Sequence, residues 1–483
     1  MIGEQYPVPV GWTWAALEDV IESAQPGFAS GKKNVPGGTN HLRMNNIGSD
    51  CRLDLSRVVT VPKELARPSH FLKYGDVLFC HTNSVKLVGK TALFDRTDGP
   101  YAFSNHLTRL RPSAFGPLPE WLWLWLTVLW RQGYFKTRCK QWVNQATVER
   151  RTLLDSPIPV APLAEQKRIV TKVEDLFLQL RPARESLQSV LSIMRRFRQL
   201  VLSKAFRGDL MERGPDDESV GQFLKSTHEL EHEKTAAYFD RLSGGNGINL
   251  DANLQLPQGW MRKPVGEICT VVRGASPRPK GDPRYFGGQI PWIMISDITK
   301  TKGKYLYETR DHVTEAGAKR SRLLCKGTII LSNSGSIGIP KILAVDGCIH
   351  DGFVAFLDLP SWISSDYLYY YFDSIGQRLR DAFKQGITQT NLNTKIVREI
   401  PVPLAPPAEQ ERIVSKVEAM LNDIETVERW CEQSIGRVTA LEQSILTNAF
   451  KGELVPQNPN DEPASILLER IRSKHRETDL RNQ

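Results

Sequence analysis

One stretch of 18 residues occurs twice in this chain. Pro157-Ile-Pro-Val-Ala-Pro-Leu-Ala-Glu-Gln-Lys-Arg-Ile-Val-Thr-Lys-Val-Glu174 returns as Pro401-Val-Pro-Leu-Ala-Pro-Pro-Ala-Glu-Gln-Glu-Arg-Ile-Val-Ser-Lys-Val-Glu418, with 13 positions identical. The offset of 244 residues (401 minus 157) also matches Ala205-Phe-Arg-Gly-Asp-Leu210 to Ala449-Phe-Lys-Gly-Glu-Leu454 without a gap. Each copy leads into a long stretch with helical periodicity, so the sequence predicts an internal repeat built on two long helices.

Both long stretches carry apolar residues at the seven-residue period of a coiled-coil seam. A stripe of this length is not buried by one helix, so we expect the two helices to pair with each other. Pro182 lies inside the first helix, and we expect a kink or a local break there. The predicted seam residues are Ile169, Val173, Leu176, Leu180, Leu187, Val190, Met194, Phe197, Val201, Ile413, Val417, Met420, Ile424, Val427, Val438, Leu441 and Ile445.

The segments between the repeats predict two further globular units. Each opens with Pro-x-Gly-Trp, at Pro9 and at Pro257, and each contains a turn glycine, Gly75 or Gly327, that leads into a β-branched, strand-like run. The aromatic helix predicted at 119–131 aligns Trp123 with Tyr367 at the same offset, and we expect its aromatic side chains to form core. Short apolar runs separated by glycine and proline make both units mainly β.

These patterns predict an α+β fold with a pseudo-twofold internal repeat, in which two mainly β domains are separated by two long helices that pair as an antiparallel coiled coil. The expected segments are a first β domain at 1–156, a helical region at 157–225, a linker at 226–256, a second β domain at 257–400 and a second helical region at 401–483. Each helical region consists of a long helix, a turn and a short helix.

Composition and charge narrow the class of protein. A chain of 483 residues with 40% apolar and 24% charged residues is expected to be globular and to contain several domains. The seven scattered cysteines and the lack of a secretory leader or a ~20-residue apolar span indicate a cytoplasmic location. Residues 9–150 hold 18 Lys+Arg against 11 Asp+Glu, and 257–394 hold 18 against 12, so the positive charge lies in the β domains. Such a field favours a polyanionic partner, although a solubility surface remains an alternative.

The sequence contains no convincing catalytic centre. His228-Glu-Leu-Glu-His232 has the spacing of a zinc-binding helix, but it lies in a polar tract without a third ligand. Gly89-Lys-Thr91 resembles the end of a phosphate-binding loop, yet Ser84 occupies the position of the first glycine. Pro215-Asp-Asp-Glu-Ser219 resembles nuclease carboxylates, but its repeat at 459–463 indicates a turn. We therefore predict that the chain itself is not an enzyme and binds no metal.

The repeated Pro-x-x-Ala-Glu-Gln-x-Arg-Ile-Val-x-Lys-Val-Glu block and the helix ending Ala-Phe-x-Gly-[Asp/Glu]-Leu resemble the conserved regions of type I restriction–modification specificity subunits. The resemblance covers 157–224 and 401–468. It implies that the β domains are target-recognition domains, each binding half of an asymmetric bipartite site in double-stranded DNA. The helices would act as a spacer and as a docking surface for two modification (adenine methyltransferase) subunits, with restriction (translocase and nuclease) subunits joining that complex. S-adenosylmethionine, ATP and Mg would then bind to the partner subunits, and this chain would hold no cofactor.

Candidate DNA contacts follow from residue chemistry alone. Arginine and asparagine can read base edges with paired hydrogen bonds, whereas lysine more often binds phosphate. We selected such residues in polar or turn-like stretches, where an ordinary solvated role is the competing interpretation. The candidates are Lys32, Lys33, Arg43, Asn45, Asn46, Asn83, Lys86, Lys90, Arg273, Arg278, Lys280, Arg284, Lys302, Lys304, Asn333, Ser334 and Lys341. The alternative functions are a coiled-coil scaffold that binds only protein and a fused DNA-modifying enzyme.

Overall fold

The computed structural model describes residues 7–143, 145–212, 214, 218–226, 255–385 and 392–481. Most of the expected linker and the sequence at 228–232 therefore lie outside the described residues. The chain forms two compact units, which we call unit 1 (Met1–Leu187 with Glu432–Gln483) and unit 2 (Gln188–Cys431). These units cut across the segments expected from the sequence, because each contains half of both long helices. Within the described residues, no helix is long and apolar enough to cross a membrane.

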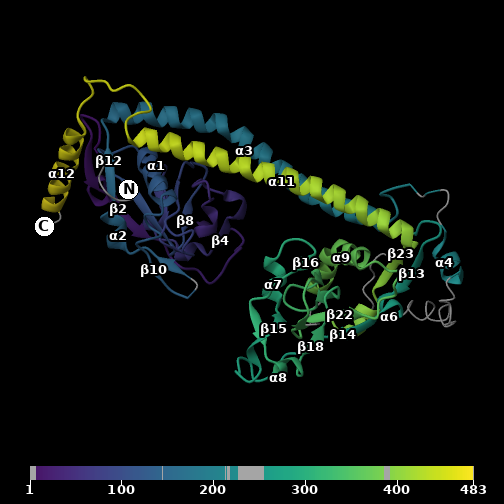
Figure 1. Ribbon diagram of the computed structural model, residues 1–483. Helices are drawn as coiled ribbons and strands as arrows, with labels where there is room; N and C mark the ends of the chain where they lie inside the picture. The colour runs from purple at the N-terminus through teal and green to yellow at the C-terminus, as the bar shows by residue number, and fades with distance from the viewer. Residues whose placement is uncertain are drawn as a thin grey trace. The chain divides into compact units, whose positions relative to one another are not determined.

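Unit 1 is built from small sheets packed on one aromatic helix, α1 (Pro119–Arg131) (Figure 1). Its largest sheet is antiparallel, with the strand order β2-β9-β5-β7. The smaller sheets have the orders β4-β3-β8, β10-β11-β6 and β1-β12. The strands are β1 (Thr13–Ala16), β2 (Ile21–Pro26), β3 (Thr39–Leu42), β4 (Val59–Val61), β5 (Val77–Cys80), β6 (Thr82–Asn83), β7 (Thr91–Leu93), β8 (Tyr101–Phe103), β9 (Leu107–Pro112), β10 (Lys140–Gln141), β11 (Ala146–Thr147) and β12 (Pro157–Val160).

Unit 2 has the same plan with larger sheets. A five-stranded sheet, β14-β22-β19-β20-β16, packs on α9 (Ser365–Gln385), and a four-stranded sheet has the order β17-β15-β21-β18. The strands are β13 (Met261–Pro264), β14 (Thr270–Arg273), β15 (Phe286–Ile293), β16 (Tyr305–Leu306), β17 (Asp311–Val313), β18 (Arg322–Leu324), β19 (Ile329–Ser332), β20 (Pro340–Leu343), β21 (Gly347–Ile349), β22 (Phe353–Leu357) and β23 (Pro401–Leu404). The short helices are α4 (Val220–Ser226), α6 (Val265–Ile268), α7 (Ile295–Lys300), α8 (Glu315–Ala318) and α10 (Thr394–Arg398).

The predicted glycine turns lie where the sequence placed them. Gly75 and Gly327 have φ values of 87° and 86°, a conformation that costs a residue with a Cβ but not glycine. The buried strands β5 and β19 begin two residues later. The prediction of mainly β units within an α+β fold is therefore confirmed.

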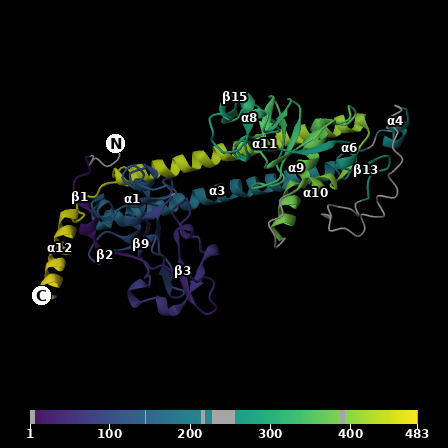
Figure 2. The same cartoon turned by 90° about the horizontal axis from the view of Figure 1, so that it is seen from below.

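The two long helices are α3 (Leu163–Ala205) and α11 (Pro407–Phe450). In unit 1 the N-terminal half of α3 lies beside the C-terminal half of α11, and in unit 2 the halves are reversed, so the pairing is antiparallel (Figure 2). The ends of the seam join the cores of the units: Ile169 and Val173 pack with Ile445 in unit 1, and Val201 packs with Ile413 in unit 2. Pairing of the two predicted helices is confirmed.

Two predicted seam residues are largely exposed. Phe197 is 38% exposed and Leu441 is 49% exposed, whereas the other 15 are buried or half-buried. A pair of helices covers only one side of a large side chain, so at these two positions the other side remains in contact with solvent within the described part of the chain. The break expected at Pro182 does not occur, because α3 continues through this exposed residue.

The repeated Pro-x-Pro segments anchor the aromatic helices. In unit 1, Nε1 of Trp121 and of Trp125 donate to the carbonyl oxygens of Pro159 (2.8 Å) and Pro157 (2.6 Å). In unit 2, the Tyr367 hydroxyl donates to the carbonyl of Pro403 at 2.7 Å, and the Tyr371 hydroxyl donates to that of Pro401. Tyr367 is therefore equivalent to Trp121, at an offset of 246 (367 minus 121).

The alignment of Trp123 with Tyr367 was consequently wrong by two residues. The repeated Gln166 and Gln410 support the corrected offset, since they accept hydrogen bonds from the amides of Leu118 (2.9 Å) and Ser364 (3.0 Å). An alignment at a constant offset of 244 cannot detect that unit 2 has two residues fewer than unit 1 between the aromatic helix and the repeated block that follows it. The predicted core role of the aromatic residues is confirmed, because Trp121 and Tyr367 are both fully buried.

The Pro-x-Gly-Trp segment at the start of each β domain contacts the short helix that follows a long helix. The amide of Ala464, the first residue of α12 (Ala464–Arg481), donates to the Gly11 carbonyl at 2.8 Å, and Val220 of α4 does the same to Gly259 at 2.9 Å. The buried carboxylate of Glu165 accepts a hydrogen bond from Nε1 of Trp12 at 2.9 Å. These contacts explain why the last 52 residues, Glu432–Gln483, fold with the first β domain.

Charges at equivalent repeat positions are inverted between the units. In unit 1, Glu442 of α11 pairs with Arg184 of α3 and with Arg131 of α1, both at 3.0 Å. The position 244 residues earlier is Arg198 of α3, which in unit 2 pairs with Glu425 (3.6 Å) and Asp373 (3.8 Å). Each unit therefore keeps an ion pair where the two long helices meet its aromatic helix, with the signs exchanged.

Candidate DNA-binding surfaces

In unit 1 a sharp turn, Ser104–His106, connects β8 to β9 and brings two loops together. The amide of Phe28 donates to the Phe103 carbonyl at 3.1 Å, and the amide of Asn105 donates back to the Phe28 carbonyl at 3.1 Å. A Cβ at Gly27 would lie 2.0 Å from the Phe103 carbonyl oxygen, so only glycine permits this approach. The following loop exposes the candidates Lys32 and Lys33.

On its other side, this turn contacts β6 and the β10–β11 hairpin. The amide of Thr82 donates to the His106 carbonyl at 3.4 Å, and β6 pairs with β11 through Asn83 and Ala146. Asn83 is half-buried and uses its side chain locally, toward Ser84 and Cys80, whereas Lys86 is exposed. We call the surface formed by 27–34, 82–86, 104–106 and the hairpin the turn surface of unit 1.

Unit 2 repeats this construction with different side chains. The amide of Ala275 donates to the Ile349 carbonyl at 3.3 Å, and that of Asn333 donates to Gly352 in the turn His350–Gly352 at 2.9 Å. A Cβ at Gly274 would lie 2.2 Å from the His350 carbonyl oxygen. The turn surface of unit 2 consists of 273–284, 333–336 and 350–352, and it includes the exposed candidates Arg273, Arg278 and Lys280.

Asp351 organises the turn surface of unit 2. Its carboxylate accepts a hydrogen bond from the Ser276 hydroxyl at 2.6 Å and lies 3.0 Å from Nε2 of His350, while its carbonyl accepts from Nε of Arg273 at 2.9 Å. Burial by itself would raise the pKa of Asp351, but the Ser276 hydroxyl, His350 and Arg273 together hold that pKa below its ordinary value. Asp351 therefore remains an anion that fixes a basic loop.

His350, which lies next to Asp351, has a lowered pKa. Burial lowers the pKa of His350, and the nearby Arg278, Lys280 and Arg273 lower it further against the opposing effect of Asp351. A neutral imidazole leaves the positive charge of the surface to the exposed arginine and lysine side chains. Sequence reasoning missed His350, Asp351 and Ser276, because nothing local to them indicates that the turn meets a loop some 75 residues away.

The structure removes two unit 1 residues from the candidates. Lys90 is 5% exposed and its ammonium donates to the Ile47 carbonyl. Asn46 is fully buried, accepts from the amide of Arg43 at 2.8 Å and donates to the Asp54 carbonyl at 2.8 Å. Both side chains hold loops together and cannot reach a nucleic acid.

Three unit 2 candidates are also structural. Lys341 is 4% exposed and donates to the carbonyls of Thr301 (2.9 Å) and Gly303. Lys304 forms ion pairs with Asp366 at 2.7 Å and with Glu418. Asn333 is 1% exposed, so only its backbone contributes to the turn surface.

The remaining candidates are at least partly accessible, and their role stays a prediction. Arg284 is exposed but bonds Asp282 at 2.6 Å, which occupies part of its guanidinium. Arg43 and Ser334 are half-buried, whereas Asn45 and Lys302 are exposed. Exposure permits a contact with DNA but is equally compatible with a solvated surface.

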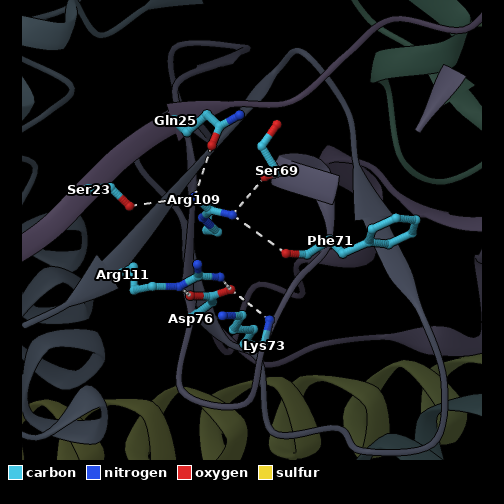
Figure 3. Close-up of polar contacts among 8 residues, drawn as sticks. All are labelled: Ser23, Gln25, Ser69, Phe71, Lys73, Asp76, Arg109 and Arg111. Carbon is cyan, nitrogen blue, oxygen red and sulfur yellow. Dashed lines mark hydrogen bonds and ion pairs between the residues drawn. The ribbon is translucent and has the colours of Figure 1, made fainter. Parts of the chain in front are cut away.

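Part of the positive charge of unit 1 is internal (Figure 3). Arg109 of β9 is 4% exposed, and its guanidinium donates to the Ser69 carbonyl at 2.8 Å and to Gln25 at 2.9 Å. Beside it, Arg111 forms a two-point ion pair with buried Asp76, with both distances 2.7 Å. Burial lowers the pKa of Arg109, whereas the hydrogen bonds that Arg111 donates to Asp76 raise the pKa of Arg111. These arginines fasten the loop at 62–76 to the sheet and do not face DNA.

The second half of the chain matches a DNA specificity domain. The family model described as "Type I restriction modification DNA specificity domain" covers residues 257–432. The chain is 26% identical over 448 residues to the type I restriction enzyme StySPI specificity subunit of Salmonella potsdam, covering 90% of this chain and 88% of that one. It is 25% identical over 447 residues to the EcoKI specificity subunit of Escherichia coli K12, again covering 90% and 88%.

A similar fold occurs in a solved structure described as the "structural basis underlying complex assembly and conformational transition of the type I R-M system". That likeness has a TM-score of 0.60 and 19% identity, and it covers 93% of this chain and 100% of that one. The matches include both β domains and both long helices. The chain as a whole is therefore similar to the specificity subunits of type I restriction–modification systems, and residues 257–432 match the DNA specificity domain of that family.

Proposed function

We propose that each turn surface binds one half of an asymmetric bipartite DNA site and that the paired long helices set the spacing between the halves. The observation that carries this proposal is the repeated construction with different side chains. Equivalent backbone hydrogen bonds build the turn at Ser104–His106 and at His350–Gly352, but only lysines border the first, whereas two arginines and a lysine border the second. Two domains with the same backbone arrangement but different side chains can bind two half-sites of different base sequence.

The catalytic steps belong to partner subunits in this proposal. Modification subunits supply the adenine methyltransferase with S-adenosylmethionine, and restriction subunits supply ATP- and Mg-dependent translocation and cleavage, all in the cytoplasm. The specificity subunit binds DNA and positions these enzymes. Each β domain has a net positive charge, which supports an electrostatic contribution to DNA binding.

Mapping methylated adenines in a host that carries the whole system tests the proposal. The expected result is one bipartite sequence with unequal halves, and removal of one heptad from each long helix should change the preferred spacer length. Binding of the specificity–modification complex should weaken steeply as salt concentration rises, because phosphate contacts release counterions. A single continuous site, an unchanged spacer or salt-independent binding would contradict the proposal, and the last result would favour a protein-binding scaffold.

Arg278→Ala is expected to relax one base position of the unit 2 half-site. The exposed guanidinium can donate two hydrogen bonds to a guanine edge, so its loss should cost about 1–3 kcal/mol for the correct base and much less for others. Binding is measured by titration against a set of single-base variants of the mapped site.

Lys280→Ala is the matched comparison on the same loop. A phosphate contact should be lost there, so all sequences should weaken alike and the salt slope should fall by about 1. If Arg278→Ala also weakened every sequence equally, base reading by Arg278 would be excluded.

The exposed seam residues support docking of two modification subunits. Phe197 and Leu441 are equivalent at the offset of 244, and each presents an apolar side chain beside the seam, one in unit 2 and one in unit 1. Two copies of one partner need two similar contacts. The other exposed apolar residues of the helices, including Ile193, Leu200 and Trp430, have no apolar equivalent, since Arg437, Ser444 and Ser186 occupy those positions.

Phe197→Asp and Leu441→Asp are each expected to release one modification subunit, because a carboxylate would be buried without a partner in the contact. Native mass spectrometry should show one fewer modification subunit for each single variant and neither subunit for the double variant. Gln199→Asp, on a different side of α3, should retain both. Retention of two subunits by both single variants, with normal helix content by circular dichroism, would place the docking surface elsewhere.

A further inference from the structure

The tip of the β10–β11 hairpin in unit 1 exposes two large apolar side chains. Trp142 is 70% exposed and Val143 is 99% exposed, although the tip is closed by a hydrogen bond from the Trp142 amide to the Gln145 carbonyl at 2.7 Å. The other tryptophans of unit 1 are buried or half-buried. Burial of an indole ring gives a large favourable free energy, which an exposed Trp does not obtain. A Trp exposed at the tip of a closed hairpin therefore suggests a surface that is buried when a partner binds.

The hairpin is continuous with the turn surface. Strand β11 pairs with β6 in register, with Ala146 opposite Asn83 and Thr147 opposite Thr82, and Thr82 is bonded to the turn at His106. Figure 1 shows β10 at the edge of unit 1 opposite α3 and α11. The tip therefore extends the candidate DNA surface and lies away from the long helices on which partner subunits are proposed to dock.

The electrostatic surroundings suit a polyanion. Residues 136–150 contain Lys136, Arg138, Lys140 and Arg150 against the single acid Glu149. All five side chains are exposed, and Glu149 is occupied by its ion pair with Lys140. Arg138 lies over the ring of Tyr134, with 4.0 Å to the ring centroid, which holds its guanidinium at the base of the hairpin. An apolar tip between basic flanks is the pattern of a side chain that enters a nucleic-acid groove.

We propose that Trp142 inserts into the DNA duplex within the half-site bound by unit 1, where its indole stacks on a base and unstacks one base step. This inference rests on the proposed function and specifies how one half-site is distorted. Lys136, Arg138 and Lys140 contact the flanking phosphates, and Val143 fills the space beside the ring. The cost of unstacking is offset by indole–base stacking and by burial of an apolar surface that is otherwise in water.

The described residues of unit 2 differ from unit 1 at the place of the hairpin. The amides of Val148 and Leu392, which are 244 residues apart, donate to the carbonyls of His81 (2.9 Å) and Asn333 (3.2 Å). At the same offset, strand β10 (Lys140–Gln141) corresponds to Lys384–Gln385, which form the end of helix α9 and not a strand. The inference therefore concerns the unit 1 half-site alone.

The test uses the complex of the full chain with its own modification subunits on the mapped DNA site. The fluorescent adenine analogue 2-aminopurine, placed in turn at each adenine of the unit 1 half-site, reports loss of stacking. The wild-type complex should increase the fluorescence at one position, and Trp142→Ala should abolish that increase and weaken specific binding by roughly 5- to 150-fold. Trp142→Phe should retain most of both effects because phenylalanine also stacks.

Phe115→Ala is the matched control. Phe115 is a 48% exposed aromatic residue of the same unit, located beyond the far end of β9 from the turn at Ser104–His106. It should behave as the wild type in both measurements.

Three outcomes would overturn the inference. The first is a Trp142→Ala complex with wild-type fluorescence and affinity on a site that the wild type discriminates, which would leave the proposed function intact. The second is loss of a modification subunit from the Trp142→Ala complex by native mass spectrometry, which would make the tip a protein contact. The third is a wild-type complex that binds the mapped site and scrambled DNA equally, which would overturn the proposed function together with this inference.

Discussion

Phe450→Ala is expected to destabilise unit 1 by about 3–5 kcal/mol, the usual cost of removing a buried aromatic ring and leaving a cavity. Phe450 is 1% exposed at the end of α11, and its ring centroid lies 4.6 Å from that of Trp121 and 5.0 Å from that of Trp125. Those tryptophans hold the Pro157 and Pro159 carbonyls, so the cavity would loosen the junction between the aromatic helix and the repeated block. Amide hydrogen exchange should accelerate in α1 and β12.

Phe206→Ala provides the symmetric comparison in unit 2. Phe206 is 5% exposed and contacts Tyr367 and Tyr371, with ring centroids 5.1 and 5.4 Å away. Exchange should accelerate in α9 and β23 and not in α1. If either variant accelerated exchange equally in both units, the two units would unfold as one cooperative structure and the prediction of unit-specific damage would be wrong.

Asp76→Asn is expected to cost about 3 kcal/mol in the free energy of unfolding, the lower end of the range for breaking a buried ion pair. Asp76 is 1% exposed, and its carboxylate accepts two hydrogen bonds from Arg111 and one from the Lys73 amide at 2.7 Å (Figure 3). The neutral amide would leave the Arg111 guanidinium without its counterion and beside the buried Arg109. The lower end applies because the Arg111 side chain is 18% exposed and retains some solvation.

Chemical denaturation of Asp76→Asn, Arg111→Met and the double variant measures this effect. The double variant should be more stable than the sum of the two single costs predicts, because it removes both charges and leaves neither unpaired. Strictly additive costs would show that the ion pair contributes nothing beyond the separate side chains.

The long helices and the strands that follow the glycine turns could be predicted because their signals are local. Thirteen identities in 18 residues define the repeat, a seven-residue period defines the seam, and Gly75 and Gly327 mark turns that only glycine adopts without strain. The resemblance to type I specificity subunits rests on the same local block. None of these signals requires knowledge of which distant residues meet.

The aromatic helices show where local similarity is insufficient. Trp123 and Tyr367 share the offset of the repeats, but the hydrogen bonds to Pro159 and Pro403 make Trp121 the true equivalent of Tyr367. A helix of alternating Trp and Leu fits several registers equally well by residue type. Only the fixed positions of two carbonyl oxygens select one register.

The candidate site was predicted less well, because its residues are sorted by long-range contacts. Lys90 and Lys341 are the same residue type as Lys86 and Lys280, yet each is buried against a carbonyl about 40 residues away in the chain, Ile47 for Lys90 and Thr301 for Lys341. Residue type does not report whether a lysine meets water or a carbonyl. The turn surfaces likewise arise where a glycine backbone approaches a distant turn.

The sequence by itself therefore determined the repeat, the helix seam, the α+β class and the resemblance to type I specificity subunits, since each depends on identity or period along the chain. The tertiary structure alone decided which polar residues are accessible, how the Asp351 and Asp76 clusters form, and that Trp142 stands exposed at a hairpin tip. Burial depends on which segments pack together in space, and that pairing is a property of the folded chain as a whole.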